Sequence, residues 1–305
     1  IYTLSLHDAL PIWSAKKKLA LLLTLLFTLS ILVGCGGDAP AEKKDQPKEE
    51  PKEPKQETSD DSWKKVKDQG FFVLGLDDAF PPMGFREEGT NNIVGFDIDL
   101  AKEVAQRMGV EVKLQPVVWD TIVEELNGGK IDVIWNGLTI TDTRKEQIDF
   151  SQPYIANRQI IVVQPESEVK TKADFKDKKV GIQAGSSAME AVSADKEVFE
   201  SVAEWVEFGS NDEALLDLAS GRLDAVVVDE VVGRYYIAKK PDEYKIIEDN
   251  FGAEEYGIGF RKGDDAFRAE VNKALDAMKA DGKAAEISQK WFADQIGRAS
   301  CRERV

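Results

Sequence analysis

The feature that most constrains the fold is an alternation of short apolar runs with helical segments between residues 63 and 294. Each run has the length of a buried strand, and the segments between them space their apolar residues as a helix does. This alternation is typical of a mostly parallel sheet covered by helices, so the sequence predicts an α/β fold. The expected strands are residues 71–76, 131–135, 160–163, 180–183, 224–228 and 257–260.

Two of the expected helices have recognisable ends. Residues 97–108 place their apolar side chains on one stripe, and Gly109 follows as a stop signal. Ser210 and Glu213 have the spacing of a capping box, which predicts a helix start at Ser210.

A short element occurs twice in the chain. Residues 126–134 read Leu-Asn-Gly-Gly-Lys-Ile-Asp-Val-Ile, and residues 218–226 read Leu-Ala-Ser-Gly-Arg-Leu-Asp-Ala-Val. In both, a helix ends near glycine, a basic residue follows, and an aspartate precedes a buried strand. The repeat predicts two lobes of similar construction, which suits a folded region of this length.

Both ends of the chain differ in character from its middle. Residues 1–12 and 297–305 are expected to be non-native sequence, and setting them aside removes His7, the single histidine, and Cys301. With one cysteine and no histidine left, a His-based catalytic triad, a zinc site and an internal disulfide are all disfavoured. We therefore expect no metal and no cofactor.

Residues 13–34 have the features of an export signal. Three lysines precede an apolar run over residues 19–33, which is shorter than the ~20 residues that span a membrane. The run ends in Leu-Val-Gly-Cys, which resembles a bacterial lipobox and predicts lipidation at Cys35. An ordinary signal peptide or a short anchor helix is the alternative. Residues 35–62 are polar and rich in proline, and we expect them to form the lipid anchor and a disordered tether.

The charge of the chain disfavours nucleic acid as a partner. It has 40 basic and 56 acidic residues and a net charge of −16. Affinity for nucleic acid depends on lysine and arginine side chains that neutralise phosphates, so an acidic protein lacks the main source of that affinity.

Six motifs of the folded region together resemble the polar amino-acid family of periplasmic-type solute-binding proteins, in particular its glutamine- and cystine-binding members. They are Gly-Phe-Asp-Ile-Asp-Leu at 95–100, Ile-Asp-Val-Ile-Trp-Asn-Gly-Leu-Thr-Ile-Thr-Asp-Thr-Arg at 131–144, Asp-Phe-Ser-Gln-Pro-Tyr at 149–154, Val-Gly-Ile-Gln-Ala-Gly-Ser-Ser at 180–187, Asp-Ala-Val-Val-Val-Asp at 224–229 and Trp-Phe at 291–292.

The resemblance implies a type II periplasmic-binding-protein fold with two lobes, a hinge and a cleft between them. Lobe 1 is expected at residues 63–158 plus 251–294, and lobe 2 at 159–250. The hinge would lie near residues 154–159 and 249–256. The implied function is a monomeric, lipid-anchored, extracytoplasmic protein that binds a polar or cystine-like L-amino acid and delivers it to the permease and ATPase of an ABC importer.

A free amino acid presents a carboxylate, an ammonium and a side chain, and the sequence offers candidates for each. Arg144 follows a buried strand, and its guanidinium can bind a carboxylate with two parallel hydrogen bonds, as the arginine of this motif does in the resembled family. Ser186 and Ser187 lie at an expected helix start, where free N–H groups favour an anion, although plain capping is the alternative. Asp229 ends a strand and is the candidate counter-ion of the ammonium.

Asn136, Gly137 and Thr139 directly follow the expected strand 131–135. Ligands in open α/β sheets gather at the carboxyl ends of strands, so these three residues are further candidates.

Asp77 is a candidate for the same site from the first lobe, with Asp78 as the alternative. Phe80 and Trp119 match ring positions that sandwich ligands in the family, while Met83 and Phe85 are weaker candidates for the wall. Gln183 stands where several relatives carry a basic residue, which weakens any transfer of specificity.

Two other classes of protein share this fold. An enzyme of the dehydratase or peptidoglycan-cleaving type is one alternative, although no motif singles out the pair of separately tuned carboxylates that glycosidase chemistry requires. A receptor sensor module is the other, and it would need a membrane helix after residue 292.

Overall fold

The computed structural model describes residues 60–296, and the side chains of residues 60–292. The predictions for residues 1–12, 13–34 and 297–305, for lipidation at Cys35 and for most of the tether lie outside the described residues. Within residues 60–296, no helix is both long enough and apolar enough to cross a membrane.

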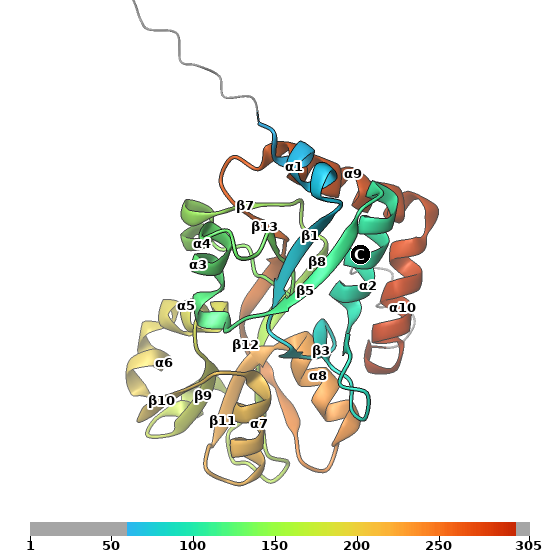
Figure 1. Ribbon diagram of the computed structural model, residues 1–305. Helices are drawn as coiled ribbons and strands as arrows, with labels where there is room; N and C mark the ends of the chain where they lie inside the picture. The colour runs from blue at the N-terminus through green and yellow to red at the C-terminus, as the bar shows by residue number, and fades with distance from the viewer. Residues whose placement is uncertain (1–59, 297–305) are drawn as a thin grey trace, which may run out of the picture. The chain divides into compact units, whose positions relative to one another are not determined.

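The first lobe is built on a five-stranded sheet in the order β5-β1-β6-β13-β7. The strands are β5 (Glu111–Pro116), β1 (Phe71–Leu76), β6 (Val133–Ile134), β13 (Gly259–Phe260) and β7 (Asp149–Phe150). Helices α2, α9 and α10 pack together beside this sheet (Figure 1). The helices of this lobe are α1 (Ser62–Gln69), α2 (Phe96–Met108), α3 (Ile122–Asn127), α4 (Asp142–Gln147), α9 (Asp265–Asp281) and α10 (Lys283–Ile296), with a 3-10 turn at Trp119–Thr121.

A small antiparallel sheet follows β1 in the chain. Its strands are β2 (Ala79–Phe80), β3 (Gly84–Arg86) and β4 (Ile93–Val94), in that order.

The second lobe has a five-stranded sheet in the order β10-β9-β11-β8-β12. Its strands are β10 (Glu204–Phe208), β9 (Lys179–Gln183), β11 (Ala225–Asp229), β8 (Ile155–Val163) and β12 (Lys245–Tyr256). Its helices are α5 (Ser187–Ala194), α6 (Lys196–Ser201), α7 (Asn211–Ala219) and α8 (Glu230–Lys239), with a 3-10 turn at Lys172–Phe175.

The two sheets follow the same plan, which confirms the α/β fold with two lobes. Each begins with three parallel strands, β5-β1-β6 in one and β10-β9-β11 in the other. The fourth strand, β13 or β8, runs antiparallel to them, and the fifth, β7 or β12, pairs antiparallel with the fourth and so runs in the direction of the first three. The sheets are therefore mixed, and four of the five strands in each run in the same direction, in agreement with the expected mostly parallel sheet.

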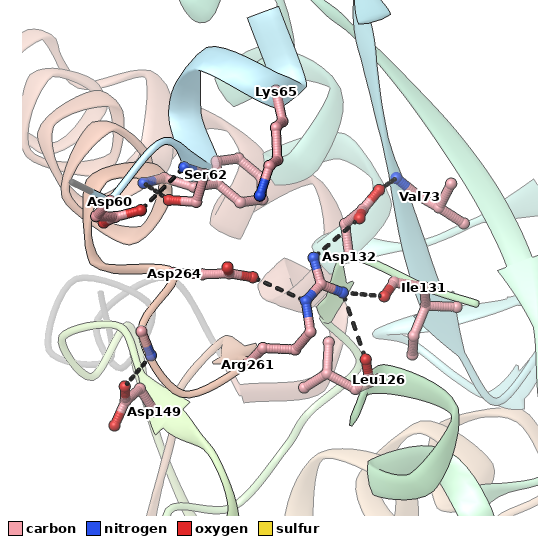
Figure 2. Close-up of polar contacts among 12 residues, drawn as sticks. Asp60, Ser62, Lys65, Val73, Leu126, Ile131, Asp132, Asp149, Arg261 and Asp264 are labelled. Carbon is pink, nitrogen blue, oxygen red and sulfur yellow. Dashed lines mark hydrogen bonds and ion pairs between the residues drawn. The ribbon is translucent and has the colours of Figure 1, made fainter. Parts of the chain in front are cut away.

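The repeated element has the same structural role in both lobes. The backbone N–H of Val73 donates to Asp132 at 2.9 Å, and the backbone N–H of Lys179 donates to Asp224, also at 2.9 Å. In each lobe an aspartate thus ties the loop after a helix to a neighbouring strand. Figure 2 shows that Arg261 adds to this in the first lobe, because its guanidinium donates to Asp132 and to the carbonyls of Leu126 and Ile131.

Several local predictions were wrong. Ser210 is the N-cap of α7, as expected, but its side chain caps no backbone N–H and donates to the carboxylate of Asp212, so the capping box with Glu213 is absent. Helix α1 begins at Ser62, one residue before the expected start of lobe 1, and the Ser62 hydroxyl accepts a hydrogen bond from Phe267 N at 3.1 Å. Strands β5, β10 and β12 were missed, and β8 begins five residues before the predicted strand.

Gly95, which precedes α2, has no room for a side chain. Its φ is +148°, and a Cβ atom there would lie 2.1 Å from the Met83 carbonyl oxygen. We expect Gly95→Ala to lower the free energy of unfolding by about 3 kcal/mol or more, because backbone strain adds to the clash. Gly109→Ala is the matched control at the other end of α2, where nothing lies within 4 Å, and about 1–2 kcal/mol is expected. Equal losses in urea unfolding would contradict this account.

Candidate functional site

A small cavity lies between residues of the two lobes, with an empty volume of about 210 Å³. Its lining contains nine of the eleven predicted site residues. They are Phe80, Trp119, Gly137, Thr139, Arg144, Gln183, Ser186, Ser187 and Asp229. The structure therefore brings together side chains from segments up to 150 residues apart in the sequence, and the charged pair Arg144 and Asp229 faces the same space.

Arg144 lies on α4, a six-residue helix whose first turn is capped by the Thr141 hydroxyl. Its guanidinium donates to the carbonyl of Thr139 at 2.9 Å and to the carbonyl of Gly185, in the second lobe, at 3.1 Å. Burial lowers the pKa of this guanidinium, and the nearby carboxylates oppose that effect. Within residues 60–292 no carboxylate forms an ion pair with Arg144, so its charge is available to a ligand.

Asp229 is the last residue of β11 and is 6% exposed. Its Oδ1 accepts hydrogen bonds from Asn157 Nδ2 at 2.6 Å, Gln159 Nε2 at 3.0 Å and the Tyr256 hydroxyl at 2.6 Å. Burial and the nearby carboxylate of Glu254 raise the pKa of Asp229 to about 7. A cation beside Asp229 would stabilise its charged form and so oppose the effects of burial and of Glu254.

The loop after β6 brings Gly137 and Thr139 to the cavity. Gly137 has φ +62°, and a Cβ there would meet the Phe80 ring at 2.7 Å, so only glycine fits. Its N–H donates to Asp97 at 2.8 Å. Thr139 is 3% exposed, and its hydroxyl oxygen accepts a hydrogen bond from Ser187 of the second lobe at 3.0 Å.

Ser186 and Ser187, at the start of α5, line the cavity from the second lobe. The Ser186 hydroxyl donates to the Gln183 carbonyl at 2.7 Å and makes no capping hydrogen bond to the helix. The first backbone N–H groups of a helix lack partners inside it and favour an anion, so this end of α5 is suited to a carboxylate.

Phe80 and Trp119 form parallel walls. Their ring centroids are 6.4 Å apart with an interplanar angle of 3°. The weaker wall candidates lie elsewhere, because Met83 is fully buried in the core and Phe85 packs against Tyr235 and Trp291.

Asp77 and Asn136 lie next to the cavity but do not line it. Asp77 accepts a hydrogen bond from Gln183 Nε2 at 2.8 Å, which joins the two lobes, and burial raises its pKa. The Asn136 side chain accepts a hydrogen bond from the backbone N–H of Asp77 at 3.1 Å. Asp78, the alternative, instead forms an ion pair with Arg86 at 2.5 Å.

The sequence reasoning missed the polar residues behind the cavity. Asp97 is fully buried, accepts hydrogen bonds from Gly137 N and the Tyr154 hydroxyl, and has a pKa raised by burial to about 7. The position of Asp97 in the Gly-Phe-Asp motif at 95–97 is the sequence feature from which it could have been predicted. Asn157, Gln159 and Glu254 lie on β8 and β12, within the two segments expected at the hinge, and were not recognised as site residues because the pairing of these strands was not predicted.

Within residues 60–292 there is no group of three or more His, Cys, Asp or Glu side chains placed to hold a metal ion.

Residues 72–294 match the family described as bacterial extracellular solute-binding proteins, family 3. The L-cystine-binding protein TcyJ of Escherichia coli K12 is 32% identical over 237 residues, covering 76% of this chain and 86% of the relative. The ABC transporter glutamine-binding protein GlnH of Bacillus subtilis is 32% identical over 286 residues, covering 91% and 97%.

Among solved structures, an ABC uptake transporter substrate-binding protein from Streptococcus pneumoniae with bound histidine superposes with a TM-score of 0.75. It is 36% identical, and the match covers 78% of this chain and 99% of that protein.

Proposed function

Because the chain belongs to family 3 of the bacterial extracellular solute-binding proteins, we propose that it captures an L-amino acid, polar or cystine-like, between its two lobes for an ABC importer. The observation that carries this proposal is the pairing of a buried arginine and a buried aspartate on one small cavity. A buried charge without a partner is costly, and a zwitterionic ligand supplies a partner to each.

The arrangement of donors and acceptors suggests how the ligand is oriented. Its carboxylate would accept hydrogen bonds from Arg144 and from backbone N–H groups at the start of α5. Its ammonium would donate to Asp229 and to the Thr139 hydroxyl oxygen. Its side chain would then lie along Phe80 and Trp119, with Asp77 and Gln183 close by.

Contacts from both lobes to the ligand couple ligand binding to closure of the two lobes. Arg144 belongs to the first lobe, while α5 and Asp229 belong to the second, so a ligand held by all three stabilises the closed arrangement over an open one. Hinge closure around a ligand is the known motion of periplasmic binding proteins. The closed form would be the one that the membrane permease and its ATPase recognise.

We further propose that the protein acts as a monomer outside the cytoplasm, held on the membrane by lipid on Cys35. The motif Leu-Val-Gly-Cys after a short apolar run supports this. Each buried methylene of an acyl chain contributes ~0.8 kcal/mol, so two chains anchor a protein without a membrane-spanning helix.

The enzyme alternative is set aside. The relatives reported above carry the names of substrate-binding proteins, and the protein is accordingly a binding protein and not an enzyme.

A thermal-unfolding panel tests the proposed function. Residues 60–296 are expected to be stabilised by one or a few L-amino acids among the common twenty and cystine, because a ligand at 100 times its dissociation constant contributes ~2.7 kcal/mol. Sugars serve as controls and are expected to have no effect. The absence of a shift with every amino acid would contradict the proposal.

A further inference from the structure

Glu254 lies on the hinge strand β12 and does not line the cavity, yet its carboxylate contacts the residues around it. Its Oε2 accepts hydrogen bonds from the Thr139 hydroxyl at 3.1 Å, Asn157 Nδ2 at 3.1 Å and Gln159 Nε2 at 2.9 Å. One carboxylate oxygen thus connects the loop after β6 in the first lobe with strand β8 at the hinge.

The hydrogen bond between Thr139 and Glu254 fixes the direction in which the Thr139 hydroxyl points its hydrogen. A carboxylate only accepts hydrogen bonds, and a threonine hydroxyl has a single hydrogen to donate. Because Thr139 donates its one hydrogen to Glu254, the Thr139 oxygen can act only as an acceptor toward every other group. The Ser187 hydroxyl already donates to it, at 3.0 Å.

The amide contacts hold Asp229 in a similar way. Asn157 Nδ2 and Gln159 Nε2 each donate to both Glu254 and Asp229. An amide NH₂ group has two hydrogens, so each amide can direct one hydrogen to each carboxylate, while the Ser187 hydroxyl oxygen lies farther from Gln159 Nε2, at 3.4 Å. The donors from Asn157, Gln159 and Tyr256 all reach Asp229 Oδ1, and within residues 60–292 no side chain donates to Oδ2.

We propose that Glu254 is a positioning residue that prepares the ammonium site, by turning the Thr139 oxygen into an obligate acceptor and by fixing Asp229 through the shared amides. This inference rests on the proposed amino-acid function. The other charged or titratable groups facing this region are Arg144 from α4, Glu190 from α5 and Tyr256 from β12.

The consequence is a preference for an ammonium over a hydroxyl at the ligand's α-carbon. An ammonium donates to both Asp229 and Thr139, whereas a hydroxyl has one hydrogen and can satisfy only one of them. In Glu254→Ala no carboxylate accepts from Thr139, and the threonine hydrogen is then free to meet a hydroxyl oxygen. Discrimination between the two ligands should therefore fall.

The test measures dissociation constants by titration calorimetry for L-cystine, L-glutamine, L-arginine and L-histidine and for the α-hydroxy acid that corresponds to each. In Glu254→Ala we expect amino-acid affinity to fall about tenfold or more, since hydrogen bonds to charged groups are among the stronger ones. The ratio of amino-acid to hydroxy-acid affinity should fall with it. Glu255→Ala, which removes the same side chain from an exposed neighbour on β12, should change both quantities less than about twofold.

Thr139→Val serves as a second variant, because it removes the hydroxyl through which Glu254 acts, and it should lose the same discrimination. If Glu254→Ala does not give a cooperative thermal transition, the discrimination of Thr139→Val decides the question. Wild-type discrimination in either folded variant, or equal losses in Glu254→Ala and Glu255→Ala, would overturn this inference and leave the proposed function standing. A wild type that binds none of the four amino acids would overturn the proposed function and this inference with it.

Discussion

Arg144→Lys is expected to weaken amino-acid binding by a factor of about 100 or more, although the positive charge is kept. The guanidinium of Arg144 donates to carbonyls in both lobes and has further N–H groups for a ligand carboxylate. A lysine ammonium is a point charge with three donors and cannot hold two carbonyls and a carboxylate in the same planar geometry. Titration calorimetry with the amino acid that stabilises the wild type most would measure the loss.

Lys145→Ala is the matched control for this variant. Lys145 is the next residue of α4, it is exposed, and it forms an ion pair with Asp142 at 3.0 Å. Its loss should leave the dissociation constant within about twofold, since exposed ion pairs contribute little. Wild-type affinity in Arg144→Lys would exclude a carboxylate clamp at this position.

Asp229→Asn is expected to change binding and stability in opposite directions. Loss of the carboxylate removes the counter-ion of the ammonium, and affinity should fall about 100-fold or more. The ligand-free protein should nevertheless become more stable at pH 8, by roughly 1–4 kcal/mol, because the wild type then holds a buried charge near Glu254.

The pH dependence follows from the raised pKa of Asp229. Between its ordinary value of 3.8 and about 7, the folded protein holds the proton and the unfolded chain does not, so stability falls as pH rises through this window. Asp97, with a pKa also near 7, contributes in the same sense. Urea unfolding at pH 5 and pH 8 should therefore show a smaller pH effect in Asp229→Asn than in the wild type. An equal pH effect in both proteins would contradict a raised pKa at Asp229.

Residues at the ends of buried strands could be predicted from the sequence. Arg144, Thr139 and Asp229 each follow an apolar run that marks a strand unambiguously, and the carboxyl ends of such strands converge. Phe80 and Trp119 came from the family resemblance, since an aromatic residue alone does not distinguish a pocket wall from a core.

Strands β8 and β12 were harder to predict because their environment depends on pairing. β12 contains Glu248, Asp249 and Asn250 and has irregular register with β8 between Ile246 and Ala253, so its residues alternate neither in polarity nor in burial. The burial of Asn157 and Gln159 follows from β12 lying beside them, a contact about 95 residues away in the sequence. Local pattern carries no information about such a contact. β5 was missed for a different reason. The expected strands were continuous apolar runs, whereas in this edge strand only every second residue is partly buried.

The pairing of β8 with β12 also restricts how the two lobes can move relative to each other. The strands are hydrogen-bonded to each other from Ile155–Tyr256 at one end to Val163–Lys245 at the other. Two segments joined in this way bend as a single ribbon, whereas two separate linkers would allow twisting and sliding as well. We therefore expect opening to have essentially one degree of freedom, so that a single pair of spectroscopic labels, one on α2 and one on α7, would report the whole movement.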